Sequence, residues 1–186
     1  MNVGFAMCGS FCTFDAVFPV LEEVAKSHRV FPILSNAAAT IDSRFGTAQA
    51  HIEKITNLCG QKPMCTIPEV EPIGPKKLLD ALIIAPCTGN TLAKLAHSIA
   101  DSPVTMAAKS HLRNGRPILI AISTNDALAG AAENIGKLLG KKHYFFVPFG
   151  QDDPHKKPTS IVANFSQIPE ALVQMAEGKQ LQPILL

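Results

Sequence analysis

Short apolar runs alternate with segments of helical periodicity along this chain. The clearest run, residues 80–86, is apolar at consecutive positions, as a central parallel strand must be when helices cover both faces of a sheet. Five such runs predict strands, at residues 3–7, 29–34, 80–86, 116–122 and 143–147. Each run ends in a turn or at a helical segment, so strands and helices are expected to alternate.

Helical segments lie between and after these runs. Apolar side chains recur at helical spacing in residues 14–25, 45–58, 91–100, 103–112, 127–139 and 168–177. Pro19 interrupts the first of them at a cost of about 3 kcal/mol, so we expect a bend there or a start near Phe18. Four prolines between residues 63 and 75 exclude a long helix in that connection.

Strands separated by helices of this length indicate βαβ units and a parallel sheet. Crossovers in such a sheet are right-handed, which leaves few topologies. We therefore predict an α/β fold: a three-layer, doubly wound, Rossmann-like parallel sheet with helices on both faces. Residues 1–186 are predicted to form one domain, with a core at about 2–147 and a carboxy-terminal loop and helix at 148–186.

Composition narrows the class of protein. Apolar residues make up 47% of the chain and charged residues only 17%, which indicates a large core or surface buried in an oligomer. A net charge of +2, one tyrosine and no tryptophan argue against nucleic acid as a partner. No apolar run approaches the roughly 20 residues of a membrane span. The first residues lack a basic leader, so a cytoplasmic protein without a membrane partner is expected.

The five cysteines are odd in number and include no CxxC pair. Neither a zinc ribbon nor a thioredoxin-type redox site is therefore expected, and no metal site is predicted. We expect most of the cysteines to be buried as small apolar side chains. Cys8 and Cys87 remain secondary candidates because they adjoin the polar turns at the strand ends.

Polar turns follow four of the predicted strands, at residues 7–13, 34–40, 85–91 and 121–126. Ligands of an open α/β sheet bind at the carboxyl ends of the strands, where free amides and hydroxyls converge on anions. One such turn is an ordinary helix cap, but four on one edge favour a ligand with a phosphate group. Neither GxGxxG nor GxxxxGK[ST] occurs, so a mononucleotide fits better than NAD or ATP.

Residues 82–96, followed by Ile99, Ala100 and Asp101, resemble the motif of the homo-oligomeric flavin-containing cysteine decarboxylases. The resemblance covers about residues 2–147 and implies FMN as cofactor. The residues that it places around the FMN phosphate are Ser10, Ser35, Thr88, Asn90 and Thr91. It also implies that Gly9 lets the backbone approach the phosphate, that Asn125 faces the flavin ring and that Phe45 covers it. Lys94 lies one turn into its helix, from which it could reach a phosphate, but a solvated helix face is the expected place for it. Asp101 is expected to cap the next helix rather than to perform chemistry.

Further segments are similar to a narrower group, the flavoprotein-like subunits of the bacterial dipicolinate synthases. These segments are residues 44–46, 101–109, 112–115, 123–128, 144–152, 157–158 and 178–183. The resemblance implies the cytoplasm of the mother cell of a spore-forming bacterium and a small dicarboxylate substrate. It also implies homo-oligomers, trimers or larger, and a dehydrogenase-like partner, the A subunit of dipicolinate synthase, that carries NAD(P).

The chain departs from the decarboxylating members of the family. Residues 70–79 lack their catalytic histidine, and no cysteine follows Cys87 to form their carboxy-terminal clamp. The catalytic residue is therefore unassigned, with Asn125 and His155 as candidates. Cations suited to a dicarboxylate are Arg44, Arg113, Lys156 and Lys157. For residues 150–158 a plain solvated loop is an equally open alternative.

Two interpretations of different class remain open. In the first, the chain is a flavin-type oxidoreductase subunit that helps to oxidise a dihydrodipicolinate-level intermediate and is inactive without its partner. In the second, it is a noncatalytic accessory subunit that binds FMN or only phosphate while the partner transfers the hydride. A flavin-dependent decarboxylase is a third, more distant alternative.

Overall fold

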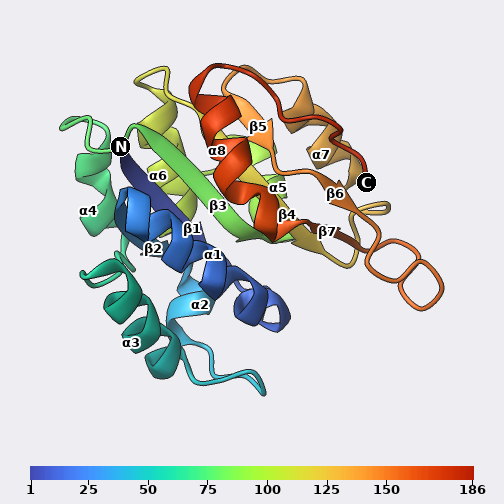
Figure 1. The fold of residues 1–186 in the computed structure, drawn as a ribbon, viewed down its shortest axis with the longest axis horizontal. Helices are drawn as coiled ribbons and strands as arrows, with labels where there is room; N and C mark the ends of the chain where they lie inside the picture. Colours follow the sequence, from blue (N-terminus) through green and yellow to red (C-terminus); the bar gives the residue numbers. More distant parts are fainter.

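A computed structural model describes residues 1–186, and its strands form one sheet (Figure 1). Five strands are parallel and lie in the order β2-β1-β3-β4-β5. Their bounds are β1 Asn2–Met7, β2 Arg29–Leu34, β3 Ala81–Cys87, β4 Ile118–Thr124 and β5 Tyr144–Phe146. Each lies within two residues of its predicted position, which confirms the predicted doubly wound architecture.

The order of the strands reverses between β1 and β3. From β1 the chain crosses to β2 on one side, and it then returns past β1 to β3 on the other. Loops leaving β1 and β3 therefore diverge, and this divergence opens a crevice at the carboxyl ends of the strands. The polar turns predicted from the sequence lie at this edge.

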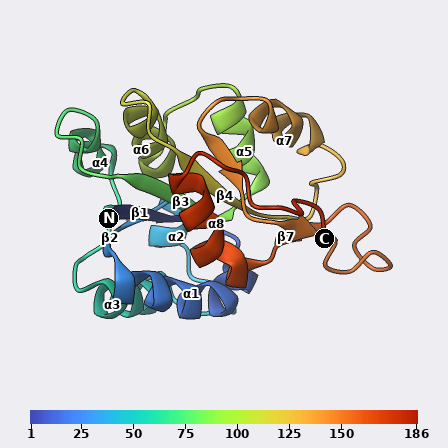
Figure 2. The ribbon, with the colours of Figure 1, turned by 45° about the horizontal axis from the view of Figure 1, so that its top comes forward.

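One face of the sheet is covered by α1 (Phe14–Ser27), α3 (Ala48–Cys59) and α8 (Ile168–Ala176), with α1 in contact with both others (Figure 2). Helix α1 starts at Phe14, so a start near Phe18 is wrong, and the exposed Pro19 lies inside it. The burial of Phe14, Phe18 and their apolar neighbours, worth about 1.5–3 kcal/mol for each side chain, outweighs the missing hydrogen bond.

The other face carries α4 (Ile67–Val70), α5 (Gly89–Ala96), α6 (Pro103–Leu112) and α7 (Ala132–Leu139). As predicted, the proline-rich connection holds only short helical turns, α4 and a 3₁₀ turn at Glu71–Ile73, and α6 has its predicted bounds. Helix α5 starts two residues earlier and ends four residues earlier than predicted. It ends because Ser98 adopts a positive φ of 60°.

Two predicted helices begin later than expected. Helix α3 starts at Ala48 because the Thr47 hydroxyl accepts a hydrogen bond from the Ala50 amide, which leaves residues 45–47 in a turn. Helix α7 starts at Ala132 because the Asp126 carbonyl accepts bonds from the Ala129 and Ala131 amides. No helix combines the length and the apolar character needed to span a lipid bilayer.

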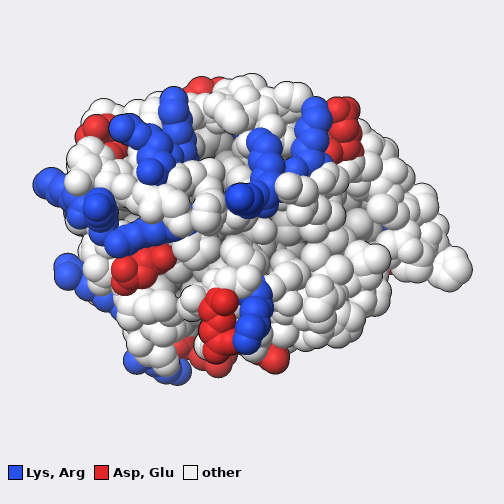
Figure 3. All heavy atoms as spheres, turned by 90° about the horizontal axis from the view of Figure 1, so that it is seen from above, with Lys and Arg blue, Asp and Glu red and all other residues white.

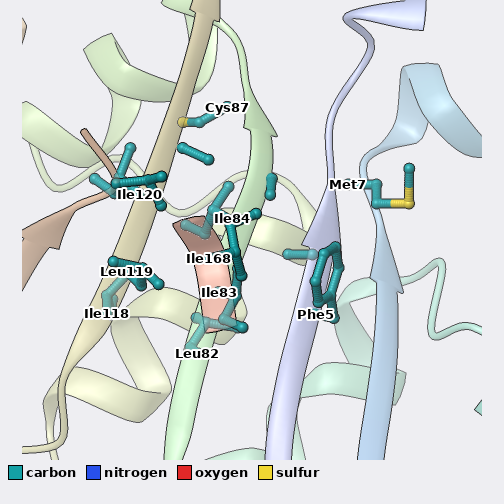
Figure 4. Packing of buried hydrophobic residues seen from close by; sticks show 14 of the residues in the cluster. Phe5, Met7, Leu82, Ile83, Ile84, Cys87, Ile118, Leu119, Ile120 and Ile168 are labelled. Carbon is teal, nitrogen blue, oxygen red and sulfur yellow. The ribbon is translucent and has the colours of Figure 1, made fainter. Parts of the chain in front are cut away.

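The core lies on both sides of the central strands β1, β3 and β4. Figure 4 shows side chains of these strands packed together, with Ile168 from α8 closing one side. Leu82, Ile83 and Ile84 are fully buried in succession, as expected for a strand covered on both faces. This core holds the ends of β1 and β3 in fixed register beside each other.

The residues after 147 form more than the predicted loop and helix. Strands β6 (Phe149–Gly150) and β7 (Ile161–Ala163) add to the sheet, with β7 antiparallel to β4. The sheet is therefore mixed, which corrects the purely parallel prediction. Because β7 pairs with Ser123 and Thr124, it carries the loop 151–160 to the carboxyl end of β4.

Candidate functional site

Two adjoining hollows lie at the carboxyl ends of the parallel strands. The first, which we call the β1–β3 hollow, measures about 470 Å³, and the second, the β4 hollow, about 220 Å³. They share Gly9 and Thr88, so they form one continuous depression. The β1–β3 hollow is lined by Gly9, Ser35, Asn36, Ala37, Thr88, Asn90, Thr91, Lys94, Asp101 and Ser102. The β4 hollow is lined by Gly9, Ser10, Cys12, Thr13, Thr88, Ser123, Thr124, Asn125, Asp152, Lys157 and Val162.

The amino-terminal end of α5 faces the β1–β3 hollow. Thr88 caps the helix, because its hydroxyl accepts a hydrogen bond from the Thr91 amide at 3.4 Å. The amides of Gly89 and Asn90 lie in the first turn, and the carbonyls four residues before them lie outside the helix, so neither amide donates an intrahelical hydrogen bond. The Asn90 side chain is exposed beside them. A helix start with free amides and a positive dipole end is suited to an anion.

Gly9 and Ser35 form the opposite wall of this hollow. A methyl group on Gly9 would lie 3.2 Å from the Ala37 Cβ atom, so the turn after β1 packs tightly against α2 (Asn36–Thr40). The Ser35 hydroxyl accepts a bond from the Ala38 amide at 3.2 Å and caps α2. Its own proton remains available, since a hydroxyl that accepts a bond can also donate one.

Thr91 lies beneath the hollow and is buried. Its hydroxyl donates a hydrogen bond to the Cys8 sulfur at 3.3 Å, so it supports the floor of the hollow. Cys8 and Cys87 are buried, and burial raises the pKa of the Cys8 thiol to about 11 and that of Cys87 well above its ordinary value. Both are therefore neutral thiols rather than nucleophiles at neutral pH.

The remaining cysteines are not buried. Cys12 is exposed, and Cys59 and Cys65 are partly exposed, so the expectation that most cysteines are buried is wrong. Cys12 lies in the helical turn after β1, where its sulfur borders the β4 hollow. No group of three His, Cys, Asp or Glu side chains is placed to hold a metal ion.

Lys94 and Asp101 form an ion pair with an Nζ–Oδ1 distance of 2.8 Å at the rim of the β1–β3 hollow. Lys94 therefore lies beside the hollow and not on a solvated helix face. The predicted capping role of Asp101 is also wrong. Ser102 caps α6 through a bond from the Thr105 amide, while the hydrogen bond from Lys94 lowers the pKa of Asp101 below its ordinary value.

Ser10 and Asn125 lie in the β4 hollow. The hydroxyls of Ser10 and Ser123 share a hydrogen bond of 2.7 Å, which joins the turn after β1 to the end of β4. The backbone carbonyl of Asn125 accepts a hydrogen bond from the Thr159 hydroxyl at 2.6 Å, and its side-chain oxygen accepts one from the Ser160 hydroxyl at 3.3 Å. The amide NH₂ group of Asn125 is thereby left to donate to a ligand.

Asp152 supplies a carboxylate to the β4 hollow, and it lies 3.0 Å from the Lys157 ammonium. Burial works to raise the pKa of Asp152, but its polar neighbours Ser160 and Lys157 outweigh this effect and hold the pKa below its ordinary value. The hydrogen bond to Asp152 raises the pKa of Lys157. The pair is therefore ionised at neutral pH and borders the hollow with one charge of each sign.

Five predicted site residues do not line either hollow. Arg44 and Phe45 lie together in an exposed turn, where the Arg44 guanidinium stacks over the Phe45 ring at 4.8 Å. His155 and Lys156 are exposed in the loop 151–160. Arg113 ends α6, away from this edge, and lines another cavity. The edge thus gathers the Ser, Thr, Gly and Asn residues from the four turns but only one of the candidate cations, Lys157.

Several lining residues were not identified from the sequence. Ser123 and Thr124 lie in the fourth polar turn, whose composition was a sufficient signal, and Asn36 follows Ser35 in the second. Asp152 had no local signal. It reaches the hollow only through the antiparallel pairing of β7 with β4.

Three comparisons relate this chain to known proteins. The family model described as Flavoprotein matches residues 1–163. The B subunit of dipicolinate synthase from Bacillus subtilis (strain 168) is 45% identical over 186 residues, which cover 100% of this chain and 93% of that protein. The crystal structure of the corresponding B subunit from Bacillus halodurans C superposes with a TM-score of 0.91, at 41% identity, over 100% of this chain and 95% of that one.

A more distant structure is Burkholderia xenovorans DmrB in complex with FMN, described as a cubic protein cage for redox transfer. It is 17% identical, has a TM-score of 0.70 and covers 95% of this chain and 96% of its own. At this identity the likeness shows a shared fold.

Proposed function

Since this chain belongs to the flavoprotein family and, within it, to the dipicolinate synthase B subunits, we propose that it is the FMN-binding subunit of a dipicolinate synthase. In that role it helps to oxidise a dihydrodipicolinate-level intermediate to dipicolinate in the cytoplasm of a spore-forming mother cell. The observation that carries the proposal is the anion-suited start of α5 beside Ser35 and Gly9, at the point where the strand order reverses.

The residues present fit the phosphate of FMN. Asn90, in the first turn of α5, and Ser35 line opposite sides of the β1–β3 hollow, and their amide and hydroxyl groups offer donors to the phosphate. The carboxylate on its rim, Asp101, is paired with Lys94, which balances its charge. Asp126, whose carboxylate lies beside Gly89, accepts a hydrogen bond from the Thr124 hydroxyl. Bound FMN supplies a group that accepts a hydride from a reduced ring.

The chain's own residues then act on the substrate in the β4 hollow. The Asn125 amide and the one hydroxyl proton that the Ser10–Ser123 pair leaves free are donors that orient a polar ring, and Lys157 attracts a carboxylate group. Aromatising a dihydropyridine ring also requires loss of a proton from carbon. Asp152, the one carboxylate that borders this hollow, accepts it in our proposal.

A noncatalytic role is the second candidate. No histidine borders either hollow, and Asp152 is already paired with Lys157. Under this alternative the site holds FMN or phosphate for structural reasons, and a partner subunit performs the hydride transfer.

We also propose two kinds of partner. The Bacillus subtilis relative is named as the B subunit of its enzyme, which supports a second polypeptide, in our proposal the A subunit with bound NAD(P). Self-association into trimers or larger rings is supported by exposed apolar side chains such as Phe45 and Val173 and by the cage described for DmrB. In such an assembly the exposed Arg44–Phe45 turn is free to reach the site of a neighbouring copy.

The proposal is tested by measuring dipicolinate formation from its ultraviolet absorbance. Each subunit is assayed alone and in a mixture, with NAD(P), with FMN and with both. We expect no product from this chain alone and full activity from the mixture, lost again when FMN is omitted. Full activity from this chain with NAD(P) would contradict the need for a partner. Full activity from the A subunit alone would make this chain accessory.

A further inference from the structure

A separate cavity of about 320 Å³ lies between α5 and α6. Its apolar wall comes from Leu95, Ile99 and Leu112, and Tyr144 of β5 contributes an aromatic ring. None of its lining residues borders the β1–β3 or the β4 hollow. Its volume is at the lower end for small-molecule sites, which suits a ligand with a single ring.

Two cations of α6 border this cavity, Lys109 and Arg113. They are four residues apart and so share one face of the helix, where like charges repel. Both are exposed, and neither forms an ion pair or a side-chain hydrogen bond, whereas the partly buried Arg116 pairs with Asp80. No Asp or Glu lines the cavity.

The wider surface does not neutralise these charges. Lys141 donates a hydrogen bond to the Ala96 carbonyl at 2.8 Å and so adds a further cation at the end of α5. Figure 3 shows Lys and Arg side chains gathered at the end of the molecule where α4 and α6 lie, with fewer Asp and Glu among them. The helix dipole favours cations at the carboxyl end of α6. The dipole alone does not explain why these cations border an apolar cavity.

Tyr144 contributes a hydroxyl group to this cavity. Burial raises the pKa of Tyr144 to about 12, so its hydroxyl keeps its proton at neutral pH. It makes no hydrogen bond to another group of the chain, and it is not among the buried polar atoms that lack a partner, so it is accessible from solvent. An accessible hydroxyl donor therefore borders the same cavity as two cations that have no acidic partner in the chain.

We propose that the α5–α6 cavity binds a small carboxylate with a compact apolar ring. The carboxylate contacts Arg113 and Lys109, the Tyr144 hydroxyl donates to it, and the ring packs against Leu95 and Ile99. A guanidinium favours a carboxylate because it binds both oxygens at once. This binding site is independent of the FMN proposal, since the two sites share no residue.

The chain itself provides the probe of this site. Tyr144 is its one tyrosine, and it contains no tryptophan, so the intrinsic fluorescence of the full chain reports directly on the cavity. Cyclohexanecarboxylate is transparent where tyrosine absorbs. We expect it to change this fluorescence saturably, with a dissociation constant of about 1 mM or tighter.

Three comparisons complete the experiment. Acetate, which lacks the ring, and cyclohexanecarboxamide, which lacks the charge, should each bind at least about tenfold more weakly. Arg113→Ala should weaken the carboxylate at least about tenfold, while Lys62→Ala, which removes an exposed cation elsewhere, should not. Calorimetry on the same samples confirms that the fluorescence reports binding. Absence of a saturable change, or equal affinity for the unmodified chain and Arg113→Ala, would overturn the proposal.

Discussion

We expect Asn90→Asp to weaken FMN binding at least about 100-fold while leaving the fold intact. Asn90 occupies the first turn of α5, where its side chain is exposed at the rim of the β1–β3 hollow. A carboxylate about 4 Å from the phosphate repels it by roughly 4 kcal/mol at an effective dielectric constant of 20. That energy corresponds to about a thousandfold weaker binding. Solvent screening reduces the repulsion, so the expected loss of affinity is at least about 100-fold.

The same substitution favours the helix. A negative charge in the first turn stabilises a helix by about 0.3–1 kcal/mol, so a loss of FMN binding cannot be assigned to unfolding. Titration with FMN, followed by flavin fluorescence, measures the change. Asn57→Asp adds the same charge on the exposed surface of α3 and serves as the control. Unchanged affinity in Asn90→Asp would place the phosphate elsewhere.

We expect Asp152→Asn to lower the turnover of the reconstituted synthase by about 10²–10⁴-fold, the usual contribution of a general base. The substitution keeps the shape of the side chain but removes its ability to accept a proton from the substrate. It also breaks the partly exposed pair with Lys157, which costs only about 0–1 kcal/mol. FMN affinity should not change, because Asp152 borders the β4 hollow and not the β1–β3 hollow.

Asp153→Asn is the matched control, since the neighbouring carboxylate borders neither hollow. Its turnover should equal that of the unmodified enzyme. Full turnover in Asp152→Asn, with FMN bound, would contradict a catalytic role for this residue and would favour the noncatalytic interpretation of the chain.

The arrangement of the site could be predicted from the sequence where the signal is local. Residues 80–86 are apolar on both faces, and this pattern identifies β3 and therefore the turn that begins at Cys87. Because parallel strands end at one edge of a sheet, four polar turns along the chain imply one polar edge in space. The structure confirms that edge, including the contact between Ser10 and Ser123 across 113 residues.

The rest depends on long-range contacts that have no local pattern. Strand β7 is three residues long and follows a polar loop, so nothing nearby indicates that it pairs with β4 and brings Asp152 to the hollow. Arg113 illustrates the opposite error. Its guanidinium group suits a carboxylate, so the sequence predicted that it lies beside the substrate. Helix α6 instead ends at a different cavity, which Arg113 lines.

The most direct test of the account compares FMN with riboflavin, which lacks only the phosphate, in binding to the unmodified chain. Hydrogen bonds to a charged group are worth about 1.5–3 kcal/mol each. Two such bonds, one from an α5 amide and one from Ser35, predict that FMN binds at least about 100-fold more tightly than riboflavin. In Asn90→Asp this preference should disappear, with riboflavin binding unchanged. Equal affinities for FMN and riboflavin in the unmodified chain would contradict the claim that this edge of the sheet binds the FMN phosphate.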